Sequence, residues 1–304
     1  MGLRGEEDPR RDRSAQTAPE QAGPRRNRGL SSRLLLLLAV LILALVAVGA
    51  VILWRSLGDG VSGTSVAKDS IDSAGPEPRV RLANAAGSVR VEGMKDAESV
   101  EYEATRYALG ADPADAKQQA SQVPVNISRE GSEITIETDG GDDTGADYVL
   151  RVPAGASAEV ESEAGDVEIS GLSGNVNVEA GAGDVTVRDA GGNVRVRAPQ
   201  GDAAVANVNT DTGGAEIEVG SGDVFLENLV LGTLEAAVEA GTVTLSGRFS
   251  GDGLVSVQTG DIVARLPAED TRDLTLQTRV GNVLREPPAG GSNGQGSENK
   301  EKGS

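Results

Sequence analysis

The chain has 304 residues, with 28 Lys and Arg against 47 Asp and Glu, so its formal net charge is −19. Such an acidic chain excludes nucleic acid as a partner of its main body. It contains no cysteine and no histidine, which excludes disulfides, thiolate nucleophiles, Cys/His zinc sites and histidine-based catalysis. Aromatic residues make up only 2% of the chain, so a folded part needs a thin interior of Val, Ile and Leu.

The N-terminal part predicts a membrane anchor. Residues 1–33 are polar and charged, and we expect them to form a disordered cytoplasmic tail. The unbroken apolar run Leu34–Trp54 follows, and as a helix it is about 31 Å long, enough to cross a bilayer. The arginines before the run predict a single-pass protein of the cytoplasmic membrane, with the N-terminus inside and the rest outside. The alternative is a cleavable signal peptide, because Ala47–Ala50 offers small residues to a peptidase.

The next residues predict a linker and an irregular folded segment. Residues 55–78 contain Gly, Ser, Asp and Pro and are predicted to be a linker, so we expect the β domain to span 79–286. Gly87–Val91 is an isolated copy of the glycine phrase that recurs later. We then expect a strand at 99–108, a helix at 116–120 behind Asp112 and Pro113, a hairpin of 123–128 and 133–138, and a strand at 148–153. This segment is expected to cover the open first turn of the repeats.

A short phrase, glycine followed by a small polar residue and alternating aliphatics, repeats through the rest of the chain. One series of glycines stands at intervals of 18, 18, 21, 19, 19 and 21 residues: Gly165, Gly183, Gly201, Gly222, Gly241, Gly260 and Gly281. A second series, half a period out of phase, includes Gly174 and Gly192. Both series lengthen together, so the unit is one turn of about 19 residues that contains two strands.

Within each repeat, alternation decides which side chains face inward. In Gly183–Arg188 we expect Val185 and Val187 inside and Thr186 outside. Stacked turns then bury a seam of branched aliphatics, which predicts an all-β fold: a two-sheet parallel β-helix. The alternative is an antiparallel β-sandwich with evenly spaced hairpins. Residues 287–304 are polar and rich in glycine, and we expect them to be a disordered C-terminal tail.

Several acids share one place in the repeat, directly after the glycine: Asp166, Asp184, Asp202, Asp223 and Asp261. In a solenoid they stack into a carboxylate ladder that a Ca²⁺ ion could relieve. Repeat-type calcium sites, however, require the phrase G-G-x-G-x-D, which this chain lacks. We therefore interpret these acids as turn residues, and we expect no metal, no cofactor and no catalytic residue.

Charged side chains between the corners offer a second candidate surface. Arg188, Arg195 and Arg197 are expected to form an outward basic stripe, with Glu168 and Glu179 nearby in the repeat. The simpler interpretation is a surface charge network, and the sharper one is binding of an acidic glycan. No turn carries a set of carboxylates that breaks the repeat, as a polysaccharide-cleaving site requires.

The segment from Tyr148 to Val187 carries a family resemblance. A strand that ends in the turn Val152–Gly155 leads into repeated Gly-Asp-Val phrases, and in this the chain resembles the bacterial putative-adhesin domain of β-strand repeats. The resemblance implies a membrane-attached, non-enzymatic β domain on the cell surface, and it transfers no catalytic residue. Together these observations predict an adhesive or structural surface module that contacts envelope polysaccharide or another surface protein. The alternatives are an envelope-stress sensor with its outer domain linked to the cytoplasmic tail, and a self-assembling scaffold.

Overall fold

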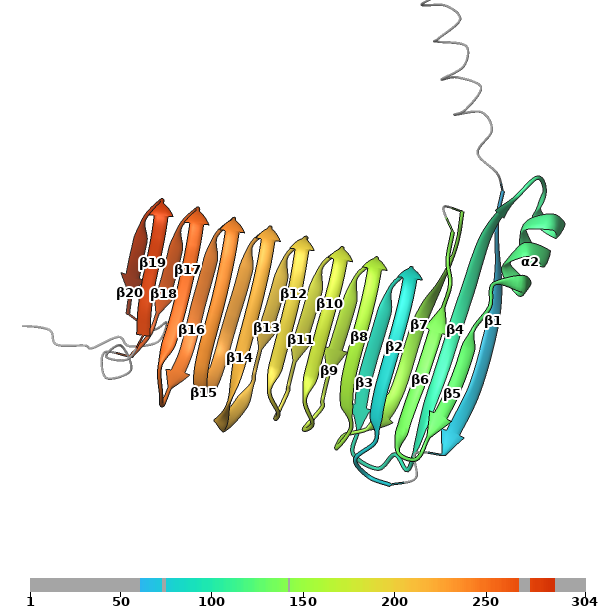
Figure 1. The fold of residues 1–304 in the computed structure, drawn as a ribbon, viewed down its shortest axis with the longest axis horizontal. Helices are drawn as coiled ribbons and strands as arrows, with labels where there is room; N and C mark the ends of the chain where they lie inside the picture. Colours follow the sequence, from blue (N-terminus) through green and yellow to red (C-terminus); the bar gives the residue numbers. More distant parts are fainter. Residues whose placement is uncertain (1–60, 73–74, 142, 268–273, 288–304) are drawn as a thin grey trace, which may run out of the picture. The chain divides into compact units, whose positions relative to one another are not determined.

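The structure is a computed structural model that describes residues 61–72, 75–141, 143–267 and 274–287 (Figure 1). The predicted tail at 1–33 and the predicted membrane span Leu34–Trp54 lie outside the described residues, as do 288–304 of the predicted C-terminal tail. Among the residues that the structure describes, no helix is both long and apolar enough to cross a membrane.

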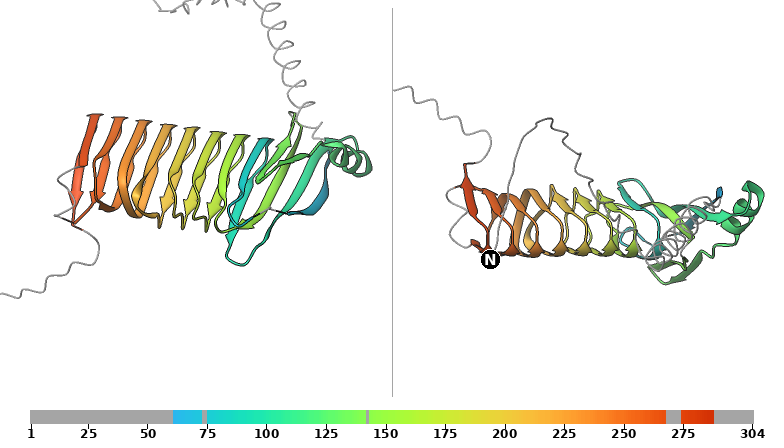
Figure 2. Two further views of the ribbon diagram at one scale, coloured as in Figure 1. Left: turned by 60° about the horizontal axis from the view of Figure 1, so that its bottom comes forward. Right: turned by 90° about the horizontal axis from the view of Figure 1, so that it is seen from above.

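The repeats form a parallel β-solenoid whose turns contribute one strand to each of two sheets (Figure 2). The long-strand sheet consists of β2 (Arg79–Ala86), β8 (Ser157–Ala164), β10 (Val176–Ala182), β12 (Val194–Gln200), β14 (Asn209–Ser221), the second half of β15 (Val224–Ala240), β17 (Gly253–Thr259) and β19 (Leu274–Val280). The short-strand sheet consists of β3 (Val89–Met94), β9 (Val167–Ser170), β11 (Val185–Arg188), β13 (Ala203–Ala206), the first half of β15, β16 (Val243–Phe249), β18 (Ile262–Arg265) and β20 (Val283–Glu286).

Within each sheet, successive strands pair in parallel. This confirms the predicted two-sheet parallel solenoid, and the antiparallel sandwich is wrong for the repeats. Val185 and Val187 are buried while Thr186 between them is not, as the alternation predicts. Because a side chain lies beside its counterparts above and below, equivalent aliphatics form continuous columns. Each buried Val, Leu or Ile contributes about 1.5–3 kcal/mol.

The glycines of the two series have different physical roles. All glycines of the first series have positive φ, for example +134° at Gly183 and +127° at Gly201, a conformation that other residues adopt only with strain. The corners also touch, because a Cβ at Gly201 would lie 2.1 Å from the carbonyl oxygen of Gly183. The second-series glycines Gly174 and Gly192 do not have positive φ, but their backbone also lies close to the preceding turn. A Cβ at Gly192 would lie 2.3 Å from the carbonyl oxygen of Gly174.

The N-terminal segment ends both sheets with antiparallel strands. On the long-strand sheet β6 (Glu133–Thr138) pairs in parallel with β2, and β5 (Asn126–Glu130) pairs antiparallel with β6. On the short-strand sheet β7 (Thr144–Pro153) pairs in parallel with β3, β4 (Ser99–Gly110) antiparallel with β7, and β1 (Val61–Asp72) antiparallel with β4. We call strands β1, β4, β5, β6 and β7 and helix α2 (Pro113–Gln122) the cap. Antiparallel strands do not continue the solenoid's path, so stacking stops there.

Chain order and spatial order differ at the cap. β2 and β3 come early in the chain, yet they lie between β6 and β7 on one side and β8 and β9 on the other. The phrase at Gly87–Val91 is therefore not isolated, because Val89 lies in register with Val167 of the repeats. Sequence spacing could not reveal this, since the chain leaves the solenoid to build the cap and then returns.

The predicted linker at 55–78 differs from the structure, because strand β1 occupies Val61–Asp72. This strand pairs with β4 along its whole length, but most of its side chains are exposed and its small, polar residues resemble a linker. Helix α2 (Pro113–Gln122) packs closely on this end, since a Cβ at Gly63 would lie 2.4 Å from the backbone nitrogen of Lys117. As predicted, Asp112 caps the helix by accepting the N–H groups of Ala114 and Asp115.

The junction between the cap and the repeats has a polar interior. Asn84 is buried and donates from Nδ2 to the carbonyl oxygens of Gly87 and Ala146, each at 3.0 Å. The hydroxyl groups of Thr138 and Tyr148 are hydrogen-bonded inside the same region. Burial raises the pKa of the Tyr148 phenol, an effect that the Thr138 hydrogen bond partly opposes. Tyr148 is the one aromatic residue among the largest fully buried side chains of the described residues.

Candidate functional site

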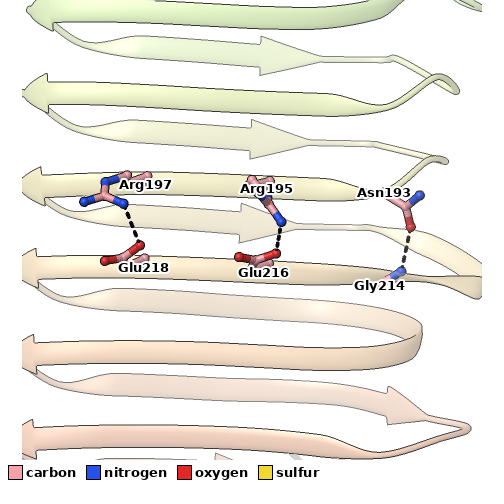
Figure 3. Close-up of polar contacts among 6 residues, drawn as sticks. All are labelled: Asn193, Arg195, Arg197, Gly214, Glu216 and Glu218. Atoms are coloured by element: carbon pink, nitrogen blue, oxygen red, sulfur yellow. Dashed lines mark hydrogen bonds and ion pairs between the residues drawn. The ribbon is translucent and has the colours of Figure 1, made fainter.

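The outer face of the long-strand sheet carries the polar side chains that point away from the core. On β12 and β14 this alternation places Arg195 opposite Glu216 and Arg197 opposite Glu218 (Figure 3). Arg197 Nη1 lies 3.2 Å from Glu218 Oε2, and Arg195 forms an ion pair with Glu216. These side chains are at least half exposed, so each pair contributes only about 0–1 kcal/mol. The pairs fix the positions of the side chains more than they stabilise the fold.

The structure does not bring the three arginines of the predicted basic stripe together. Arg188 lies at the end of β11 in the short-strand sheet, whereas Arg195 and Arg197 lie on β12 in the long-strand sheet. The basic stripe is therefore wrong, because the intervening corner turns the chain to the opposite face. Glu168 and Glu179 are separated in the same way, and Glu168 forms an ion pair with Arg90 at 2.8 Å.

Acids outnumber arginines on the outer face of the long-strand sheet. Arg81 lies 2.7 Å from Glu161 and 3.7 Å from Glu159. Four more outward glutamates of this face have no ion pair within the described part of the chain: Glu163, Glu179, Glu235 and Glu239. The face is acidic, which disfavours an acidic glycan as its ligand.

A hollow interrupts this face beside residues 207–214, here called the long corner, which follow β13 and include the first residues of β14. The hollow has a volume of about 810 Å³, and outward residues of β10, β12, β14, β15 and β17 line it together with Thr212 of the corner. The pairing between β14 and β15 shifts register between Thr210 and Gly214, which accommodates the extra residues. At this long-corner hollow the repeat departs from the 18-residue length of the two turns before it.

The side chains at the long-corner hollow form a hydrogen-bonded network. Asn193 Oδ1 accepts the backbone N–H of Gly214 at 2.9 Å (Figure 3). Asn175 Oδ1 accepts the backbone N–H of Asn193 at 3.1 Å. A Cβ at Gly213 would lie 2.5 Å from Thr210 Oγ1, so a larger residue there would require the Thr210 side chain to shift. Asn177 also lines the hollow, and its Oδ1 is shielded from solvent without a hydrogen-bond partner within the described residues.

A second groove runs across the same face on the other side of the ion pairs. Its floor consists of small residues, Ala85, Gly181, Pro199 and Gly220, and the two hollows that form it share Arg197 and Pro199. They have volumes of about 380 and 320 Å³. The Arg195 and Arg197 pairs therefore stand as a ridge between the long-corner hollow and this groove.

The predicted aspartates do stack in a ladder, and their carboxylate oxygens accept hydrogen bonds from backbone N–H groups. Each Oδ1 accepts the backbone N–H of the next turn at 2.7–2.9 Å: Asp166 from Asp184, Asp184 from Asp202, Asp202 from Asp223, and Asp223 from Thr242. Thr242 replaces the acid in one turn and so separates Asp261 from the others. No group of three or more Asp or Glu side chains within the described ranges could hold a metal ion. The Gly-Asp phrase thus supplies an acceptor for a corner N–H that the sheets leave unpaired.

The outer face of the short-strand sheet has a different character. From β11 to β20 its central column carries no charge: Thr186, Ala204, Phe225, Thr244, Val263 and Leu284 lie in register on successive strands. Phe225 is 39% exposed and Leu284 is 49% exposed. This column could not be predicted from the sequence, because a single small or apolar outward residue is common in a strand. Only the register of the strands places these residues side by side.

Sequence reasoning also missed the long-corner hollow. Its signal was present as the interval of 21 residues between Gly201 and Gly222. The three extra residues fall within Thr210–Gly213, a small and polar stretch that resembles any turn, so the interval indicated a longer corner but not a concave surface.

A family model described as Toastrack DUF4097 matches residues 79–302. No curated protein matches the chain in sequence. Among solved structures, a putative adhesin from Bacteroides fragilis is similar with a TM-score of 0.50 and 12% identity, over 73% of this chain and 97% of that one. A putative adhesin from Parabacteroides distasonis has a TM-score of 0.41 and 15% identity, over 75% and 98%.

Proposed function

Because the chain belongs to the Toastrack DUF4097 family, we propose that it is an adhesive or structural surface module of a bacterial envelope. In this proposal the helix Leu34–Trp54 anchors the protein in the cytoplasmic membrane, and the solenoid lies outside. The arginines on the N-terminal side of the apolar run support this orientation. The similar solved structure from Bacteroides fragilis is described as a putative adhesin, which agrees with a surface role.

The observation that carries the proposal is that corner side chains bond to the protein's own backbone, whereas side chains on the outer face of the long-strand sheet remain available to a partner. The corner aspartates and asparagines are engaged with the backbone of the next turn, whereas outward residues of the long-strand sheet such as Glu179 and Glu235 are not. Outward positions that lie in register on successive strands are about 4.8 Å apart along the stack. A rigid row of polar groups at fixed spacing suits an extended partner, either an envelope polysaccharide or a segment of another surface protein.

A non-enzymatic role agrees with the same arrangement. Catalytic carboxylates need one exceptional environment that shifts their protonation or holds a substrate bond between them. Here Asp166, Asp184 and Asp202 have equivalent positions and the same hydrogen bond. Their regularity supports a structural role.

The two ends of the solenoid argue against the alternative of a self-assembling scaffold. At one end the antiparallel strands β4 and β5 stop parallel stacking. At the other, the last turn places Thr278 opposite Val257 and Arg285 opposite Ala264, so polar residues stand where earlier turns have buried aliphatics. An inward-pointing charge on a terminal strand opposes the addition of another turn.

The proposal is tested with bacteria that produce the full-length chain. We expect protease added to intact cells to cleave the solenoid, and we expect these cells to bind isolated cell-wall material better than cells without the protein. Deletion of Gly2–Arg28, with the remaining arginine and the apolar run kept, should leave this binding unchanged, whereas a sensor would lose its output. Resistance of the solenoid to protease in intact cells, with cleavage after lysis, would refute an external location.

A further inference from the structure

We infer that the long-corner hollow is a binding site for a neutral, hydroxyl-rich oligosaccharide. This inference rests on the proposed function and names where and what the surface module binds. The hollow lies beside a lengthened turn of the repeat. The turn between Gly201 and Gly222 is 21 residues long, as is the turn between Gly260 and Gly281, whereas the two turns before Gly201 have 18. In the first of these longer turns Thr212 lies at the edge of the hollow. The insertion at the long corner therefore coincides with the hollow, and Thr212 contributes to its wall.

The size and shape of the hollow fit a short linear ligand. Its volume of about 810 Å³ falls in the range of about 300–1,000 Å³ that is usual for small-molecule sites. It crosses five strands, from β10 to β17, which is about 19 Å along the solenoid axis. Thr212 at the corner forms one part of the rim, and Leu254 on β17 lies at the far end.

The charges in the hollow select against an anionic ligand. Arg195 is already paired with Glu216. Glu235 and Asp252 also line the hollow and have no ion pair within the described residues, so the net charge of the hollow is negative. A uronic acid or a phosphate polymer would be repelled there.

The polar groups of the hollow match the hydroxyl groups of a sugar. The carboxylates of Glu235 and Asp252 each offer two acceptor oxygens, and the Arg195 guanidinium offers donors. Leu254, which is 36% exposed, offers an apolar contact for the C–H face of a sugar ring. A neutral saccharide presents hydroxyl donors and acceptors around such a face, and it brings no charge that must be neutralised.

The test is calorimetric titration of the full-length chain, purified in a polyoxyethylene detergent that carries no sugar. The neutral probes are cellotetraose and N-acetylchitotetraose, and the anionic probe is tetragalacturonate. We expect at least one neutral probe to bind and the anionic probe to bind at least about tenfold more weakly. Binding of neither neutral probe, or tighter binding of tetragalacturonate, overturns the inference.

A matched pair of variants locates the site. Glu235→Ala and Glu239→Ala remove the same side chain from the same strand, both outward and exposed, but only Glu235 lines the hollow. We expect Glu235→Ala to weaken saccharide binding about tenfold and Glu239→Ala to change it less than about twofold. Equal effects of the two variants would overturn the location. Cells that bind cell walls through a chain that binds neither neutral probe would refute this inference but leave the proposed function intact. Protease resistance of the solenoid in intact cells, together with saccharide binding by the purified chain, would refute the proposed function but leave the binding site intact.

Discussion

In the repeats every turn rests on a turn of the same design, whereas in the cap each strand meets a different neighbour. The repeats therefore use small, interchangeable residues, Val and Ala inside and Gly at the corners, and derive order from stacking. The cap uses larger and more individual contacts, including the buried Tyr148 and the backbone hydrogen bonds of Asn84. The same substitution should therefore change the free energy of unfolding by different amounts in the repeats and in the cap.

The largest effect is expected at a corner glycine. Gly201 has a φ of +127° and a Cβ there would lie 2.1 Å from a backbone oxygen, so both strain and a clash oppose Gly201→Ala. We expect a loss of about 4 kcal/mol in the free energy of unfolding, measured by urea denaturation. Gly131 in the cap hairpin also has positive φ, +64°, but nothing lies within 4 Å of its Cβ position. Gly131→Ala should cost only about 1 kcal/mol, and equal costs would contradict the stacking account.

The next effect distinguishes two asparagines. Asn84→Ala removes the Nδ2 group that donates to the carbonyl oxygens of Gly87 and Ala146 at the junction of cap and repeats. The hydrogen bond to Ala146 is buried. We expect it to cost about 2–3 kcal/mol. Asn177→Ala on the outward side of β10 should change stability by less than about 0.5 kcal/mol. The comparison fails if the outward substitution destabilises the protein as much as the buried one.

A pH dependence should come from the cap. Burial holds the folded pKa of Tyr148 above its ordinary value, so in alkaline solution the unfolded chain loses the phenolic proton first. The free energy of unfolding should then fall as the pH rises above about 10, and the contribution is fully present below that pH. Tyr148→Phe should flatten this fall in urea titrations between about pH 8 and pH 11. An unchanged slope in the variant would show that Tyr148 is not the group responsible.

The smallest effect is expected in the aspartate ladder. Asp202 accepts one backbone N–H, from Asp223, while Asp147 in the cap accepts both the N–H and the hydroxyl of Ser88. Asp202→Ala should cost about 1 kcal/mol and Asp147→Ala somewhat more. Asp202→Asn keeps the acceptor and should be nearly neutral. Large stabilisation of the wild type by Ca²⁺, absent in Asp202→Asn, would contradict the structural interpretation of the ladder.

The sequence predicted the repeats better than the cap because periodicity is a local signal that many turns report together. The corner glycines, the inward Val185 and Val187, and the parallel pairing all follow from it. β1 was predicted as linker because its residues are small and polar and it depends on pairing with β4 for its structure. The basic stripe failed because a corner between Arg188 and Arg195 exchanges the faces. The long-corner hollow is a property of neighbouring turns, so spacing indicated the insertion without its shape.

The central claim, that corners maintain the fold while the outer face of the long-strand sheet binds, is tested most directly by cosedimentation of the full-length protein with isolated bacterial cell walls. Wild type, Asp202→Ala at a corner and Glu235→Ala on the face would be compared. We predict that Asp202→Ala binds within about twofold of the wild type and that Glu235→Ala binds about tenfold more weakly. Loss of binding in Asp202→Ala, with Glu235→Ala unchanged, would contradict the claim.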